Sequence, residues 1–138
     1  MRNAIICLIA SLMLAGCTAS PLTTAQQQEL NEWQRDGVYV EEKNPALATG
    51  LGLLPGFGSF YTGHYGKGVF NFITWPASIL WDPYSGYNGA QTQNYFATRA
   101  YVDDQRNDAL SDLEDQLQAD EISQSEYISE KRKIREKY

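Results

Sequence analysis

Hydrophobic and polar positions divide the chain into one long apolar stretch with a polar stretch on either side. The apolar stretch runs from Pro45 to Asp82 and is rich in glycine, aliphatic and aromatic residues. Lys67 and Asp82 carry the only formal charges between positions 43 and 99. A gap of this length in a charge-rich chain indicates that the stretch is buried, either in lipid or against protein.

The polar stretch before it predicts one short helix, from about Ala25 to Asp36. Thr24 stands at the N-cap position of a capping box, and Gly37 stands where a helix commonly ends in the left-handed conformation. Leu30 and Trp33 are the main apolar positions. This helix can therefore dock on another element but cannot form a core by itself.

The apolar stretch predicts a helical hairpin. Two apolar helices, 46–54 and 69–81, flank a turn in which glycines alternate with bulky residues, and Pro55 ends the first helix. Asp82 and Pro83 stop the second helix. The glycine, serine and asparagine content of residues 84–90 then predicts a loop.

The lengths of these helices leave two interpretations of the hairpin open. As helices, residues 46–63 and 65–81 would rise about 27 and 25 Å, against roughly 30 Å of bilayer hydrocarbon. The hairpin is then either embedded or re-entrant in a membrane, or it packs on the flanking helices or on a partner through its aromatic side chains.

The acidic stretch after residue 90 predicts two further helices. The first runs from Gln91 to about Ala119, and the second begins at a capping box formed by Ser123 and Glu126. The predicted fold class is thus all-α. Its order is a lipidated N-terminus, a short helix, the apolar hairpin, a long helix and a capped short helix.

Charge and composition exclude several classes of function. The 138-residue chain has a formal net charge of −6, which argues against nucleic-acid binding, and the basic run 131–137 complements the dipole of the last helix. The sequence contains no metal-ligand spacing, nucleophile triad or phosphate-binding loop. His64, the single histidine, has no partner at local spacing and is predicted to be structural. We therefore predict no catalytic residue, no metal site and no cofactor.

The N-terminus carries a targeting signal. A basic residue precedes a short apolar run, Ala4–Met13, which is too short to span a bilayer, and Leu14-Ala15-Gly16-Cys17 follows. This tetrapeptide resembles the lipobox of bacterial lipoproteins. The resemblance implies cleavage between Gly16 and Cys17 and attachment of a diacylglycerol and an N-acyl chain to Cys17. The alternative is an ordinary secretory signal that contains a cysteine.

The residue after the cysteine bears on localisation. Thr18 stands where an aspartate resembles an inner-membrane retention signal of enterobacterial lipoproteins. Because this chain has threonine and not aspartate there, the sequence favours location in the outer membrane, with the protein facing the periplasm.

A motif in the apolar stretch resembles a known family. Its positions, taken as candidate site residues, are Pro55, Gly56, Gly58, Phe60, Tyr61, Gly63, Gly68 and Asp82. The pattern Gly-x-Gly-x-Phe-Tyr-x-Gly between two apolar segments resembles the small two-transmembrane-helix domain. Ser59 departs from that family, which often has a basic residue before the Phe-Tyr pair. The family implies a membrane hairpin and no settled biochemical activity.

The tail carries a second resemblance. Its candidate interaction residues are Leu113, Leu117, Ile122, Tyr127 and Ile134. This pattern is similar to the short C-terminal domain family of bacteria (SHOCT-like), here over residues 108–138. Asp120 replaces the glycine usual in the turn, and aspartate tolerates a left-handed conformation better than most residues. The resemblance implies a small interaction or oligomerisation module.

These observations predict four segments and a non-enzymatic protein. The segments are a signal peptide (1–16), a polar linker with a short helix (17–44), the apolar hairpin (45–83) and an acidic helical tail (84–138). The predicted function is a lipid-anchored envelope scaffold or interaction module, with membrane lipid and either a second copy or an envelope protein as partners. The alternative is a regulator or inhibitor of another envelope component, such as a prophage exclusion or envelope-stress lipoprotein.

Overall fold

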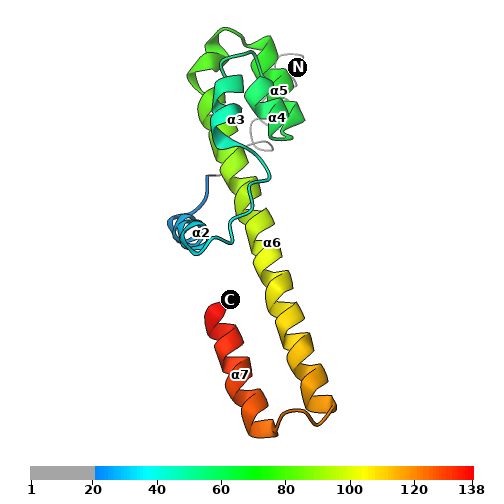
Figure 1. Cartoon of the computed structure of the whole chain (residues 1–138). Coiled ribbons are helices and arrows are strands. Elements are labelled where there is room, and N and C mark those ends of the chain that lie inside the picture. The colour runs from blue at the N-terminus through cyan, green and yellow to red at the C-terminus, as the bar shows by residue number, and fades with distance from the viewer. Residues whose placement is uncertain (1–20) are drawn as a thin grey trace, which may run out of the picture. The chain divides into compact units, whose positions relative to one another are not determined.

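The computed structural model describes residues 21–138, and every regular element in this range is a helix (Figure 1). The elements are α2 (Thr24–Asp36), α3 (Pro45–Leu51), α4 (Phe57–Tyr61), α5 (Tyr65–Ile73), the 3-10 helix η1 (Ala77–Leu80), α6 (Asp82–Gln118) and α7 (Gln124–Lys137). The predicted all-α class is confirmed. The described chain divides within α6 into two compact units, residues 21–95 and 96–138.

Helix α2 begins one residue before the predicted start, because Thr23 rather than Thr24 is its N-cap. The Thr23 side chain accepts a hydrogen bond from the backbone N–H of Gln26, and the Gln26 side chain accepts one from the Thr23 backbone. Both threonines offer the same hydroxyl, so sequence alone leaves a one-residue ambiguity. Gly37 ends the helix with φ 74°, as predicted.

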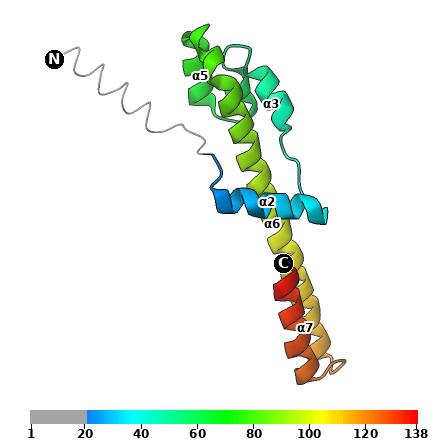
Figure 2. The ribbon, with the colours of Figure 1, turned by 90° about the vertical axis from the view of Figure 1, so that its left-hand side faces the viewer.

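Helix α2 lies across α6 (Figure 2), and its few apolar positions, which predict docking on another element, make the contact. Leu30 is fully buried, and the ring centroids of Trp33 and Tyr95 lie 5.5 Å apart. The Tyr95 hydroxyl donates a 2.7 Å hydrogen bond to Glu29 Oε2. Together these contacts join α2 to α6 within the first unit.

Residues 45–81 form four short helices rather than the predicted two. Gly56 and Gly63 adopt left-handed conformations, with φ 78° and 75°, and each interrupts the helical path. Between them, α4 forms inside the predicted glycine-aromatic turn, and the end of that turn belongs to α5. Glycine spacing marks the breaks in this segment, but it does not indicate that the five residues after Gly56 complete a turn of helix.

The predicted loop at 84–90 is wrong, because these residues belong to the first turns of α6. Pro83 is tolerated there, since the N–H that proline lacks has no helical partner in a first turn. Tertiary contacts explain the glycines. A Cβ on Gly86 would lie 2.5 Å from the Ala48 carbonyl oxygen, and one on Gly89 would lie 2.9 Å from Thr62 Cβ.

The backbones of helices α3, α4 and α6 lie in direct contact with one another. A Cβ on Gly58 would lie 2.9 Å from the Gly52 Cα and 3.0 Å from the Ala48 carbonyl oxygen, and one on Gly52 would collide with the Pro83 backbone. No larger side chain fits at these positions. Small residues therefore set the spacing of the helices in the first unit.

In the second unit, α7 folds back beside the end of α6. The Tyr127 hydroxyl donates to Glu114 Oε1 at 3.3 Å, and Lys131 Nζ donates to the Tyr127 hydroxyl at 2.7 Å. The Ser123 capping box forms as predicted, and Asp120 takes φ 57° in the turn. The left-handed conformation expected of the residue that replaces glycine is therefore confirmed.

Replacing Gly86 by alanine tests the close approach of α3 and α6. The new methyl group would press on the Ala48 carbonyl, and overpacking of this kind costs about 1–3 kcal/mol of unfolding free energy. The matched control is Gly50→Ala, because a Cβ on Gly50 has nothing within 4 Å among the described residues. Alanine there should stabilise the helix by about 0.5–1 kcal/mol. Urea unfolding that shows the same sign for both variants would contradict this packing.

Candidate functional site

The interior of the first unit is built around a buried hydrogen-bonded cluster. Ser59 Oγ donates to Asp82 Oδ1 at 2.5 Å, and Asn71 Nδ2 donates to the same oxygen at 2.6 Å. Trp81 Nε1 donates to Asn71 Oδ1 at 2.8 Å. These four residues, hereafter the Asp82 cluster, join α4, α5 and the start of α6.

The Asp82 cluster is shielded from solvent. Asp82 and Asn71 have no exposed surface and Ser59 has 1 %, while the nearby hydroxyl groups of Thr62 and Ser78 are equally buried. Asp82 Oδ2 is also buried and has no hydrogen-bond partner among the described residues. Burial of so many polar groups within a few turns of helix is costly unless they bond to one another.

The surface of the same unit is apolar. Its exposed large hydrophobic side chains are Leu47, Leu53, Leu54, Phe57, Tyr65, Val69, Phe70, Phe72, Ile73, Trp75, Ile79, Leu80, Tyr84 and Tyr87. Ile73 and Leu80 are 75 % and 85 % exposed. The polarity of residues 45–87 is therefore inverted relative to an ordinary globular domain, and so many exposed large apolar side chains in one segment indicate an interaction site.

Helix α3 runs antiparallel to α6 in the first unit. Gly52 lies against Pro83, Ala48 lies against Gly86, and the backbone N–H of Lys43 donates to Asn94 Oδ1 at 2.8 Å. The end of α3 thus meets the beginning of α6, and the chain that enters α3 lies beside α6 three turns further on.

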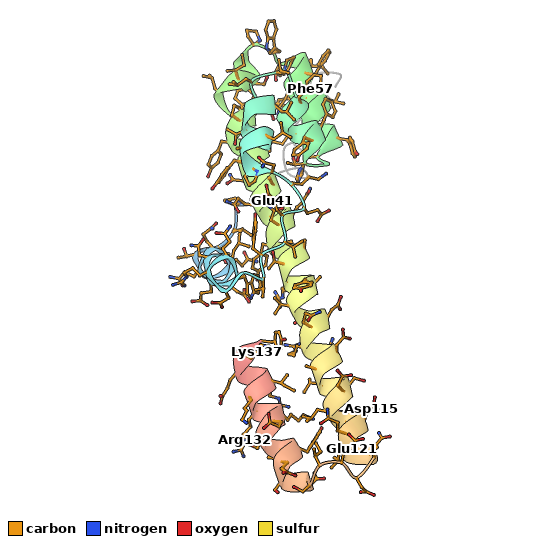
Figure 3. All side chains as sticks on the ribbon, viewed as in Figure 1. Glu41, Phe57, Asp115, Glu121, Arg132 and Lys137 are labelled. Atoms are coloured by element: carbon orange, nitrogen blue, oxygen red, sulfur yellow. The ribbon has the colours of Figure 1, made fainter. Side chains whose placement is uncertain are left out.

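The other two helices follow the same axis. Asn71 of α5 bonds to Asp82, and Lys67, earlier in α5, donates to Ser85 Oγ at 2.5 Å. In the opposite direction, α4 leads from Ser59 toward Gly89 and Gln93. The unit therefore has two ends: an apolar end formed by residues 52–57 and 72–81, and a polar end formed by residues 41–45, 61–65 and 89–94. Figure 3 shows Phe57 and Glu41 toward opposite ends.

Polar and aromatic groups crowd the polar end. Asn94 Nδ2 donates to the Lys43 carbonyl at 2.7 Å and to the Tyr39 hydroxyl at 2.6 Å. The Lys43 ammonium lies 5.1 Å from the centre of the Tyr61 ring, and the Tyr61 hydroxyl accepts from the Asn44 backbone. These bonds close the chain onto α6 just outside the apolar segment.

His64 also lies at the polar end, where its Nδ1 is 3.0 Å from the Thr62 hydroxyl. Burial lowers its pKa below the ordinary 6.5, the nearby Lys67 charge lowers it further, and hydrogen bonding with Thr62 acts in the opposite direction. The contact with Thr62 orients the imidazole within the turn after α4, which is consistent with the structural role predicted for His64.

The structure gives the motif residues of the apolar stretch different roles. Gly56, Gly58 and Gly68 allow close packing, because a Cβ on Gly68 would lie 2.6 Å from the Phe60 ring and one on Gly56 would collide with the Gly68 carbonyl. Gly63 supplies a left-handed turn, and Pro55 lies in the connection between α3 and α4. Of the predicted motif, Asp82 alone belongs to the buried cluster.

Sequence reasoning missed Ser59 and Asn71 as the partners of Asp82. A signal was present, because Asn71 is the one amide side chain between Val69 and Trp81 in an apolar helical segment. A polar residue in such a setting is expected to face a partner. Ser59 stands out as the place where the motif departs from the pattern that it resembles.

Other predicted residues lie in the second unit or outside the described range. Leu113 is buried, and Leu117, Ile122, Tyr127 and Ile134 are half-buried. Gly16 and Cys17, with the predicted leader, lie outside the described residues. Lipidation and cleavage therefore stay predictions from the sequence.

Comparisons of this chain with protein-family models, with curated proteins and with solved structures found no match. The lipobox, two-transmembrane-helix and SHOCT-like resemblances thus stay predictions. Within residues 21–138, none of the helices has both the length and the apolar character needed to cross a membrane. The same range holds no group of three or more His, Cys, Asp or Glu side chains that could bind a metal ion.

Substitution of Asp82 tests the buried cluster. In Asp82→Ala the Ser59 and Asn71 donors lose the Asp82 acceptor, and Asn71 Nδ2 keeps only its 3.1 Å bond to Ser59 Oγ. The free energy of unfolding should therefore fall by about 1–3 kcal/mol. Asp82→Asn keeps one side-chain oxygen as an acceptor, so its free energy of unfolding should fall much less. Thermal unfolding of both variants checks this order, and equal losses would show that hydrogen-bond acceptance is not what Asp82 supplies.

The lowered pKa of His64 predicts a pH-dependent contribution to stability. The unfolded chain binds the proton more readily than the folded chain, so the contribution is fully present above pH 6.5 and is lost as the pH falls through the folded pKa. Unfolding free energies measured from neutral pH to about pH 5 should therefore fall more steeply for the wild type than for His64→Gln. Parallel curves for the two proteins would contradict the assignment.

Proposed function

We propose that this protein is a lipid-anchored cell-envelope protein that acts, without catalysis, as a membrane-associated scaffold or interaction module. Its proposed location is the outer membrane, facing the periplasm. Cys17 supplies the anchor, the first unit associates with lipid, and the second unit contacts another copy or an envelope protein.

The inverted polarity of residues 45–87 carries the proposal. Side chains such as Leu80 and Ile73 face outward, whereas Asp82 and Asn71 face inward and bond to each other. In water this arrangement exposes hydrocarbon at a cost of about 25 cal/mol per Å² of apolar surface. Lipid favours this arrangement, because the outer side chains leave water and Asp82 Oδ1, Ser59 and Asn71 are hydrogen-bonded to one another.

The packing of the helices supports the same conclusion. Helices in lipid gain little from burying apolar side chains against each other, so they associate through small residues that allow close backbone contact. The contacts of Gly58 with Ala48 and Gly52, and of Gly86 with Ala48, are of this kind.

The second unit supports an interaction role. The second unit has only two buried large aliphatic side chains among its described residues, Val102 and Leu113, and its other large apolar positions, including Ile128 at 46 % exposure, stay partly exposed. So small an apolar core suits contact with a further protein surface.

Membrane association without the anchor tests this function. The chain processed from an ordinary secretory leader and carrying Cys17→Ala should float with phospholipid vesicles. The double variant Ile73→Gln/Leu80→Gln should lower the partition coefficient more than tenfold. The reason is that burial of each aliphatic side chain contributes about 1.5–3 kcal/mol, and about 1.4 kcal/mol is a factor of ten.

A matched double variant provides the control. Tyr101 and Ile128 are exposed hydrophobic residues of the second unit, so Tyr101→Gln/Ile128→Gln in the same background should leave the partition coefficient unchanged. A parent chain that stays in the soluble fraction, or equal losses in both double variants, would contradict the proposed membrane association.

A further inference from the structure

The chain enters and leaves the apolar segment at the same end of the first unit. Lys43 and Asn94, whose backbone and side chain bond to each other, mark where the chain enters and leaves the apolar segment. Both lie at the polar end. The segment between them therefore extends away from this point and returns to it.

Exposed apolar side chains gather at the opposite end. Leu53 and Leu54 lie in the α3–α4 connection and Phe57 begins α4. Phe72 and Ile73 end α5, and Trp75, Ile79 and Leu80 lie between α5 and α6. No charged residue occurs in residues 46–66 or 68–81. The Asp82 carboxylate lies at this level but is enclosed by Ser59, Asn71 and Trp81.

The reach of the segment matches one leaflet of a bilayer. Helix α6 rises about 18 Å from Asp82 to Asn94, and the nine residues of α5 rise about 13 Å. Half of the hydrocarbon thickness is about 15 Å. The distance from the polar end to the apolar end is therefore that of a single leaflet.

The polar end has the chemistry of a membrane interface. Tyr65 is 70 % exposed at the beginning of α5, and the Lys43 ammonium lies over the Tyr61 ring. Tyrosine is enriched where hydrocarbon meets headgroups, and lysine extends its ammonium toward lipid phosphates. Lys67, between the two ends, directs its ammonium to Ser85 of the protein.

We propose that the first unit inserts its apolar end into one leaflet of the membrane, with the polar end at the headgroups and both flanking chains on the same side. This inference rests on the proposed membrane association and adds the inserted residues, their depth and their topology. The occupant of the apolar surface is lipid acyl chain.

Depth-dependent fluorescence quenching tests the proposal. Processed Cys17→Ala protein contains no cysteine, because the one other cysteine of the sequence, Cys7, lies in the predicted leader that the secretory leader replaces. Leu80→Cys and Tyr65→Cys, both at highly exposed positions that disturb no buried contact, each accept an environment-sensitive fluorophore. Vesicles contain lipid brominated either near the headgroup or midway along the acyl chain, with iodide trapped in the lumen of a parallel set.

The expected result separates the two positions. The label at position 80 should be quenched several-fold more by bromine midway along the chain than by bromine near the headgroup, and the label at position 65 should show the reverse order. Iodide in the lumen should quench neither label.

Any other quenching pattern contradicts either the insertion into one leaflet or the proposed membrane association. Quenching of the position-80 label by lumenal iodide would mean that the segment reaches the far side, and binding without acyl-chain quenching would mean that it stays at the surface. Either result overturns insertion into one leaflet and leaves the proposed function standing. If neither the labelled proteins nor the unlabelled parent bind vesicles, both the insertion into one leaflet and the proposed function are overturned.

Discussion

Close contact between helix backbones at small residues is the constraint on which the first unit depends. Gly52, Gly58 and Gly86 leave no room for a side chain between α3, α4 and α6, and Ala48 lies against two of them. Because the helices touch through their backbones, little interior space remains for leucine or phenylalanine. The large apolar side chains of the segment are therefore directed outward, and the surface that we propose to meet lipid is a consequence of how the interior is packed.

The same closeness determines what the interior contains. Small polar groups fit between backbones that approach this far, and Asp82 at the first position of α6 reaches Ser59 on α4 and Asn71 on α5. Hydrogen bonds are directional, so these contacts fix which turns of the helices face each other more sharply than apolar contact would. The Asp82 cluster thus complements the glycine contacts, which set the distance between helices but allow them to slide.

Local signals predicted the elements whose ends are fixed by their own residues. The capping box at Ser123, the left-handed Gly37 and the unusual φ of Asp120 all follow from side chains within a few positions. The prediction failed where a glycine serves a distant contact. Gly86 and Gly89 read as loop residues in sequence, yet they lie in α6 because Ala48 and Thr62 occupy the space beside them.

The sequence by itself determined the all-helical class, the apolar segment with its nearly uncharged interval, the acidic tail and the helix caps at Gly37 and Ser123, because composition and short-range spacing carry that information. Only the tertiary structure decided that the segment forms four short helices, that Asp82 meets Ser59 and Asn71, and that apolar side chains gather at the end away from Lys43 and Asn94. Those features depend on which residues, 11 to 51 positions apart, lie side by side. Periodicity shows that a face is apolar, but not whether the face turns inward or outward.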